Sequence, residues 1–310
     1  MDMKYLIWLQ ELRVNFGDGV EKFFTIFTDV SVAVALVLAT VIFWCVNKRA
    51  GKFLLLVFSF TQFIIQLLKS TFCVYRPWIL DPNVHPTTAA QNSASTYSFP
   101  STHTGDATAI YGGIAYYFRK KFPLLIIPCA LTILIVAFSR NFLGMHTPQD
   151  VLVAILEAVI VMIIVDKMMN FIDNENFFTL GAIIFGVIAA AYLLLKSYPI
   201  DYYNGKILVE PARAINDAIK HLESFFGMII GLALERRFVN FKVDVNLSKK
   251  IFRVIFGLAI LYTFYGLIPS ALKAVDLKQL STFSSWFGVN FSITFLIPFL
   301  FVRLEKRFFI

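Results

Sequence analysis

The sequence predicts an all-α membrane protein, a polytopic bundle of about nine membrane helices. Hydrophobic residues make up 58% of its 310 residues and aromatic residues 16%, whereas soluble domains are roughly 45–50% apolar. Apolar stretches of about 20 residues, long enough to cross a bilayer, recur from one end of the chain to the other. No polar stretch between them is long enough for a separate soluble domain, so one integral bundle is the simplest interpretation.

The predicted spans lie near 30–47, 53–71, 104–118, 122–138, 149–166, 177–196, 218–235, 251–272 and 282–302. The span 218–235 has the shortest strictly apolar part, from Phe225 to Leu234, and a re-entrant segment is the alternative there. Segment 1–29 mixes charged and aromatic residues and lacks the basic start, apolar run and cleavage site of a signal peptide. We therefore expect it to be retained as an amphipathic helix at the membrane interface.

The formal net charge of +8 comes from Lys and Arg in short turns, so we ascribe it to membrane topology and not to nucleic-acid binding. Four basic clusters fall on one side of the bilayer: Lys48, Arg49 and Lys52; Arg119, Lys120 and Lys121; Arg236, Arg237, Lys242, Lys249 and Lys250; Arg303, Lys306 and Arg307. The positive-inside rule makes this side cytoplasmic. The N-terminus and segments 72–103, 139–148, 197–217 and 273–281 then lie outside a cytoplasmic membrane.

Polar and ionisable residues form three clusters at the outer ends of apolar spans. The first is Lys69 with Arg76-Pro77, the second is Pro100-Ser101-Thr102-His103, and the third is Ser139-Arg140 with His146 and Asp150. Ionisable groups at membrane depth are costly unless they are paired or functional. Three such clusters facing one compartment therefore indicate a common site.

The spacing K-x6-R-P, P-S-x-H, S-R-x5-H-x3-D resembles the type 2 phosphatidic acid phosphatase superfamily, which includes lipid phosphate phosphatases, glucose-6-phosphatase and vanadium haloperoxidases. Three ordered motifs on one face are a far more specific signal than a single short motif. The resemblance covers about residues 30–196, which it implies are a six-helix membrane phosphatase core. Residues 197–310 would add about three C-terminal membrane helices of unknown role.

The resemblance implies that His146 is the nucleophile that forms a phosphohistidine and that His103 is the general acid. Lys69, Arg76 and Arg140 would supply cations for phosphate, with Ser101 and the amides near Thr102 as neutral donors. No metal and no cofactor would then be needed. The family usually has Gly where this chain has Thr102, but Thr is tolerated if the position is already helical.

Local sequence explains how Asp150 would orient His146. In His146-Thr147-Pro148-Gln149-Asp150, Thr147 is typical of a helix N-cap and Pro148 of the first helical residue. The Asp150 carboxylate can then point back to the imidazole and keep one ring nitrogen protonated.

For some of the remaining polar residues the sequence leaves two interpretations open, and for others it predicts a purely structural role. Asp106 is either a partner of His103 or a favourable charge near a helix N-terminus. His85 and His221 belong to no motif and are expected to be loop or interface residues. Tyr198, Tyr202 and Tyr203 form an aromatic belt or line a headgroup site. Cys45, Cys73 and Cys129 are expected to be inert thiols.

The leading functional hypothesis is an integral-membrane phosphatase that hydrolyses a lipid phosphomonoester or pyrophosphate at the non-cytoplasmic face. A sugar phosphatase of the glucose-6-phosphatase type and a lipid phosphotransferase use the same residues and remain alternatives. From another class, a catalytically silent lipid-binding or transport protein would also have many spans, although the intact histidines and Asp150 argue against silence. A vanadate-dependent peroxidase suits the pocket but not a bundle without a soluble domain.

Overall fold

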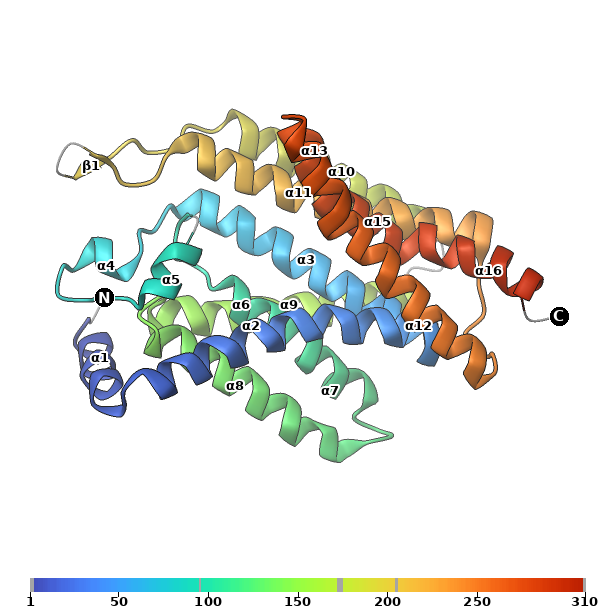
Figure 1. The fold of residues 1–310 in the computed structure, drawn as a ribbon, viewed down its shortest axis with the longest axis horizontal. Coiled ribbons are helices and arrows are strands. Elements are labelled where there is room, and N and C mark those ends of the chain that lie inside the picture. Colours follow the sequence, from blue (N-terminus) through green and yellow to red (C-terminus); the bar gives the residue numbers. More distant parts are fainter. Residues whose placement is uncertain (1–2, 95, 172–174, 204–205, 309–310) are drawn as a thin grey trace. The chain divides into compact units, whose positions relative to one another are not determined.

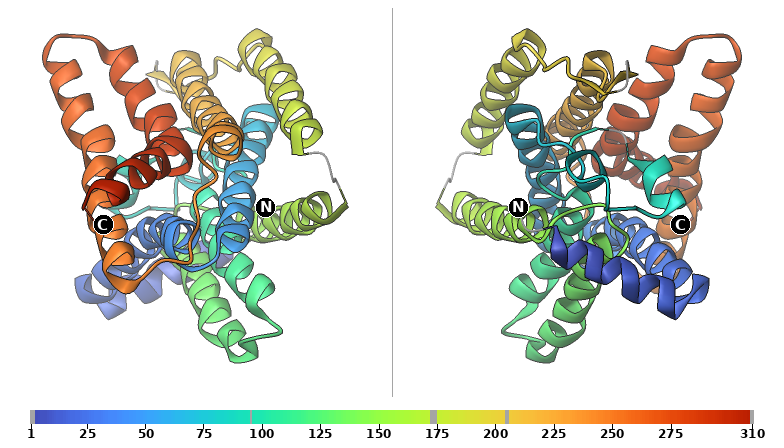
Figure 2. Two further views of the ribbon diagram at one scale, coloured as in Figure 1. Left: turned by 90° about the vertical axis from the view of Figure 1, so that its right-hand side faces the viewer. Right: turned by 90° about the vertical axis from the view of Figure 1, so that its left-hand side faces the viewer.

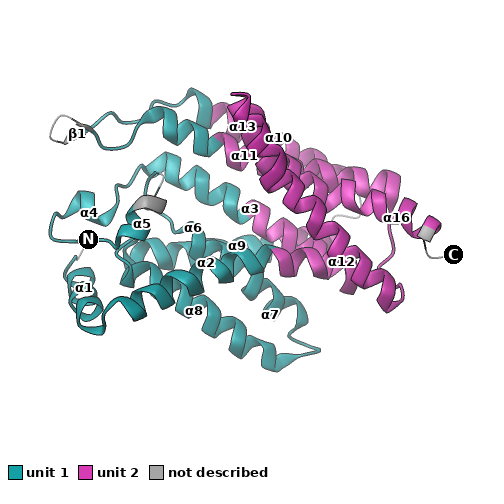
Figure 3. Cartoon of the chain, in the orientation of Figure 1, with its two compact units in different colours: residues 1–36, 61–164, 193–218 teal, residues 37–60, 165–192, 219–310 magenta. Residues whose placement is uncertain are grey.

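The computed structural model describes residues 3–94, 96–171, 175–203 and 206–308, and within these ranges the regular structure is helical apart from one pair of short strands (Figure 1). The strands, β1 (Tyr202–Tyr203) and β2 (Lys206–Ile207), pair antiparallel. The predicted all-α bundle is therefore confirmed. The chain divides into two compact units, one made of residues 1–36, 61–164 and 193–218 and the other of residues 37–60, 165–192 and 219–310 (Figure 3).

Six helical segments of the described chain are long and apolar enough to cross a membrane: Asp18–Val46, Lys48–Leu80, Pro123–Phe142, Glu175–Leu195, Leu247–Ala274 and Lys278–Arg307. The chain is thus a multi-pass membrane protein. The other three predicted spans are also helical, in the segment 102–118, in α9 (Pro148–Phe171) and in α11 (Pro211–Leu234). Each of the last two has 24 residues, which is about 36 Å at 1.5 Å per residue.

The first unit contains the segments that carry the three polar clusters. Its helices are α1 (Lys4–Phe16), most of α2 (Asp18–Val41), the end of α3 (Lys48–Phe72), α4 (Pro77–Leu80), α5 (Thr88–Ser93), α6 (Thr102–Ala107), α7 (Gly113–Phe118), α8 (Ile126–Phe142), most of α9 and the start of α11. A π-helical turn over Thr108–Gly112 joins α6 to α7. The resulting continuous helical segment packs along α8, and the two form the paired green helices of Figure 2.

The N-terminal segment differs from the prediction in where the membrane helix starts. Helix α1 ends before Gly17, and α2 begins at Asp18, inside the segment assigned to the interface. Asp18 and Glu21 lie in the first turn of α2, where acidic side chains are favoured by the helix dipole. Helix α1 is held against α8, because Arg13 donates hydrogen bonds to the carbonyl oxygens of Phe142 (2.7 Å) and His85 (2.5 Å).

The second unit contains the end of α2, the π-helical turn Ile42–Val46, the start of α3 and the end of α9. It also contains most of α10 (Glu175–Leu195) and α11, and all of α12 (Leu247–Tyr262), α13 (Ile268–Ala274), α14 (Lys278–Phe283), α15 (Val289–Phe291) and α16 (Ile297–Phe308). The buried Trp44 indole donates to the carbonyl of Ile293 at 2.8 Å. A Cβ at Gly257 would come within 2.4 Å of the Trp44 ring, so α12 packs there only because this residue is glycine. A two-pronged ion pair between Arg253 and Glu305, at 2.6 and 3.1 Å, further ties α12 to α16.

Candidate active site

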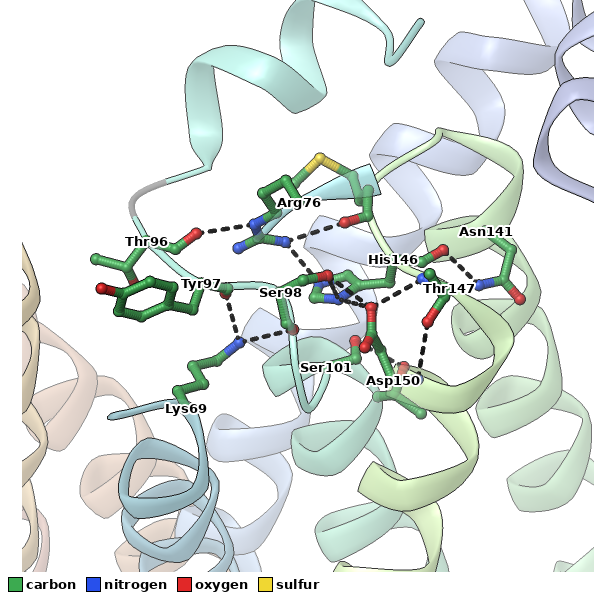
Figure 4. Close-up of polar contacts among 12 residues, drawn as sticks. Lys69, Arg76, Thr96, Tyr97, Ser98, Ser101, Asn141, His146, Thr147 and Asp150 are labelled. Atoms are coloured by element: carbon green, nitrogen blue, oxygen red, sulfur yellow. Dashed lines mark hydrogen bonds and ion pairs between the residues drawn. The ribbon is translucent and has the colours of Figure 1, made fainter. Parts of the chain in front are cut away.

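His146 and Asp150 are held together by the start of α9, as the local sequence predicts. Helix α9 begins at Pro148, and the Asp150 amide donates to the Thr147 hydroxyl at 3.3 Å. In return, the Thr147 amide donates to the Asp150 carboxylate at 2.8 Å, which completes a reciprocal cap of the helix. The same carboxylate lies 3.4 Å from Nδ1 of His146 (Figure 4).

The two ring nitrogens of His146 have different partners. A guanidinium can only donate hydrogen bonds, so the 3.0 Å contact between Arg76 and Nε2 requires a lone pair on Nε2. The proton of the neutral ring is then on Nδ1, toward Asp150. Burial first, and then the neighbouring Arg76 charge, lower the pKa of His146 well below its usual value, although Asp150 opposes the shift. The imidazole is therefore neutral at neutral pH, with Nε2 free of a proton.

Ser98 is a site residue that the sequence did not identify. Its hydroxyl donates to the Asp150 carboxylate at 2.6 Å and lies 3.3 Å from Nδ1 of His146. Ser98 lies just before the P-S-x-H motif and belongs to none of the three motifs, so no sequence pattern identifies it. Its contact with both members of the pair fixes the orientation of the carboxylate.

The cations of the first motif are positioned by main-chain oxygens. The Lys69 ammonium, at the end of α3, donates to the carbonyls of Tyr97 and Ser98 at 3.1 Å each. Arg76, just before α4, donates to the carbonyls of Thr96 (3.0 Å) and Met145 (3.1 Å). Figure 4 shows these side chains converging on the loop that precedes α6. Carbonyl oxygens orient both cations without cancelling their charge.

Arg140 completes the group of cations. It lies near the end of α8, and its Nε has no hydrogen-bond partner among the described residues. Lys69, Arg76 and Arg140 are each at most 7% exposed, while Asp150 is the only carboxylate among the predicted site residues. Three buried cations beside the reactive histidine, one of them with an unused Nε donor, provide charge and hydrogen bonds that suit an anion such as phosphate.

Ser101, Thr102 and His103 begin α6. Thr102 is the first helical residue, which confirms that threonine is tolerated there, and the amides of the first turn lack intrahelical acceptors. The Ser101 amide is already used, because it donates to the Asp150 carbonyl at 3.0 Å. His103 lies 3.9 Å from Asp29 of α2, a partner that the sequence did not reveal, and its side chain is 37% exposed.

The structure decides the alternatives for several other polar residues. Asp106 accepts a hydrogen bond from Gln62 at 3.3 Å, whereas the carboxylate that lies near the His103 ring is that of Asp29. His85 is exposed in a loop, and His221 packs against Trp286 with ring centroids 5.7 Å apart.

The tyrosines of the 197–205 loop do not share one environment. Tyr198 is buried and donates to the Leu193 carbonyl at 3.1 Å, whereas Tyr202 is exposed. The side chain of Tyr203 lies outside the described residues. The three cysteines are free thiols.

No group of three or more His, Cys, Asp or Glu side chains in the described ranges has the arrangement of a metal site. The roles assigned to the site residues and the independence from metal stay predictions.

Comparison with known families matches two parts of the chain. Residues 50–173 match the PAP2 superfamily, and residues 222–307 match the PAP2 superfamily phosphatase transmembrane extension. The second match covers C-terminal spans that lay beyond the motif resemblance. The domain division into 1–29, 30–196 and 197–310 is not tested by these matches.

Similar curated proteins match over part of the chain. Sphingosine-1-phosphate phosphatase 1 of Mus musculus is 30% identical over 43% of this chain and 31% of its own length. Probable sphingosine-1-phosphate phosphatase of Dictyostelium discoideum is 28% identical over 51% of this chain and 40% of its own length. Phosphatidylglycerophosphatase B of Bacillus subtilis (strain 168) is 33% identical over 33% of this chain and 49% of its own length. The matches thus span less than half of each relative, and no solved structure matches significantly.

Proposed function

Because residues 50–173 form a PAP2 superfamily domain and residues 222–307 its transmembrane extension, the chain belongs to the PAP2 superfamily, and we propose that it is an integral-membrane lipid phosphatase. The proposed reaction is the hydrolysis of a lipid phosphomonoester or pyrophosphate through a phosphohistidine on His146. The observation that carries this proposal is the position of His146 between Asp150 at Nδ1 and Arg76 at Nε2. Such a ring is a neutral nucleophile beside a cation that binds phosphate.

In the first chemical step, Nε2 of His146 attacks phosphorus, and the bond from phosphorus to the leaving oxygen breaks. Negative charge spreads over the three equatorial oxygens, and Lys69, Arg76 and Arg140 stabilise it. The His146 ring becomes positively charged, like an imidazolium, when Nε2 is phosphorylated. Asp150 stabilises this charge through the proton on Nδ1. His103 gives a proton to the leaving oxygen, and the Asp29 carboxylate lies 3.9 Å from its Nε2.

In the second step, water attacks the phosphorus, and the bond between phosphorus and Nε2 breaks. His103, now neutral, accepts the water proton and returns to its starting form. Inorganic phosphate leaves, and His146 regains its lone pair. The proton that His103 donates in the first step is thus recovered from water in the second, so the two steps balance with water as the only co-reactant.

Substrate assignment rests on the relatives and on the location of the site. The names of the similar proteins specify sphingosine-1-phosphate and phosphatidylglycerophosphate as substrates, and both are lipid phosphates. Lys69 ends an apolar helix, so a lipid can present its phosphate there while its chains stay in hydrocarbon. A sugar phosphatase and a phosphotransferase remain alternatives with the same catalytic residues.

Purified protein in detergent with EDTA should release phosphate from lipid phosphates. The panel is phosphatidate, a sphingoid-base phosphate, phosphatidylglycerol phosphate, undecaprenyl pyrophosphate and glucose 6-phosphate, and we expect the highest kcat/KM for one of the lipids. A higher kcat/KM for glucose 6-phosphate than for every lipid would reject the lipid assignment but not the phosphohistidine. Loss of activity in EDTA, restored by a divalent metal, would reject the metal-free mechanism.

The site should face outside, opposite to the basic turns. Ala89 and Lys120 are both exposed, so each is a suitable position for a single cysteine in a variant whose native cysteines are replaced by serine. An impermeant maleimide should label Ala89→Cys in intact cells and label Lys120→Cys only after permeabilisation. The reverse pattern would place the catalytic residues in the cytoplasm.

A further inference from the structure

The second unit contains a cavity of about 600 Å³ that none of the proposed catalytic residues lines. It lies among the start of α3, the ends of α9 and α11 and the start of α10, all within this unit. One part of its wall is charged, with Lys48, Arg49, Lys52 and Arg236 as the cations and Glu175 and Glu235 as the acids. The remaining wall is largely apolar and includes Phe43, Leu56, Met168, Phe178 and Leu232.

The acids of the cavity do not neutralise its cations. Lys48 is fully occupied, because it donates to Glu235 (2.7 Å), Asn240 (3.2 Å) and the Phe241 carbonyl (3.1 Å). Lys52 and Arg236 share the single carboxylate of Glu175, at 2.6 and 3.0 Å.

Arg49 contacts the neutral amide oxygen of Asn170 at 2.7 Å. Among the lining residues that the structure describes, four cations face two carboxylates, which leaves an excess of two positive charges.

The exposure and pairing of these charged side chains favour an anionic ligand. Lys52 and Arg236 have side chains 23% and 30% exposed, so their charges are less screened than those of free surface residues. Glu175 is 48% exposed and can move toward solvent when another anion takes its place. A phosphate group between Lys52 and Arg236 would gain charge-assisted hydrogen bonds, and an attached acyl chain would cover the apolar wall.

We propose that this cavity binds the headgroup of an anionic phospholipid, with its phosphate between Lys52, Arg236 and Arg49. The start of α3 and the end of α11, which both line the cavity, carry two of the basic turns of the sequence, and a bilayer presents anionic headgroups to such turns of a membrane protein. A free anion in water would use only the charged part of the wall. The apolar part therefore favours a lipid over a soluble phosphate, and the site is separate from the proposed reaction.

The test is native mass spectrometry of the full-length protein in detergent with phosphatidylglycerol, a phosphodiester that a phosphomonoesterase does not cleave. The wild type should bind phosphatidylglycerol in preference to phosphatidylcholine. Lys52→Gln/Arg236→Gln should weaken phosphatidylglycerol binding about ten-fold or more. Glu175→Gln should strengthen it several-fold, because it removes the competing carboxylate, and misfolding cannot produce a gain of affinity.

The matched control is Lys120→Gln/Lys121→Gln, which removes the same charge from an exposed turn outside the cavity. This control should bind phosphatidylglycerol as the wild type does. Equal losses in both double variants, or no preference over phosphatidylcholine, would overturn the proposal. Displacement of the lipid by inorganic phosphate at equal concentration would identify a site for soluble anions and would also overturn it.

Discussion

His146→Asn is expected to reduce kcat/KM by about 10⁴-fold or more, because it removes the atom that bonds to phosphorus. The asparagine side chain keeps a polar group in the buried position, but its amide nitrogen is not a nucleophile and cannot replace Nε2 of the imidazole. Wild-type protein stopped during turnover of a labelled substrate should carry an acid-labile, base-stable phosphate, as expected for phosphohistidine. The variant should carry none.

His85→Ala is the matched control for this substitution. It also removes an imidazole, but its side chain is exposed in a loop, so activity and labelling should stay within about two-fold of wild type. Turnover that persists in His146→Asn, or a covalent phosphate that survives in it, would show that another group is the nucleophile.

His103→Asn is expected to lower turnover of an alkyl phosphate by about 10²–10⁴-fold, the usual contribution of general acid and base catalysis. The effect should depend on the leaving group. The phenolate of an aryl phosphate is a good leaving group and departs without help from an acid, so the first step with this substrate should stay fast in the variant. Its second step still lacks the base, and the phosphoenzyme should therefore accumulate after a burst of one equivalent of phenol.

His221→Ala provides the comparison for His103→Asn, because this ring packs on Trp286 in the other compact unit. It should show neither the loss of turnover nor the burst. If His103→Asn slows alkyl and aryl phosphates equally and no phosphoenzyme accumulates, His103 acts in substrate binding and not in proton transfer.

Local features of the chain were predictable because they depend on neighbouring residues. The N-cap of α9 at Thr147 and the helical position of Thr102 follow from side chains within a few positions of each other. Long apolar stretches likewise specify membrane helices by length and composition alone. The start of α2 at Asp18 was not predicted, since the charged residues of its first turns read as an interfacial segment.

The sequence by itself determined the membrane fold and the order of the three motifs, and it predicted which cations and histidines form the site, since each of these depends on composition or spacing. Only the tertiary structure decided which distant groups meet. It brings Ser98 to Asp150 at 2.6 Å, Asp29 to His103 at 3.9 Å and the loop carbonyls to Lys69. These pairings join residues far apart in the sequence, and the packing of the helices and of the loop before α6 sets their distances, which no local pattern along the chain encodes.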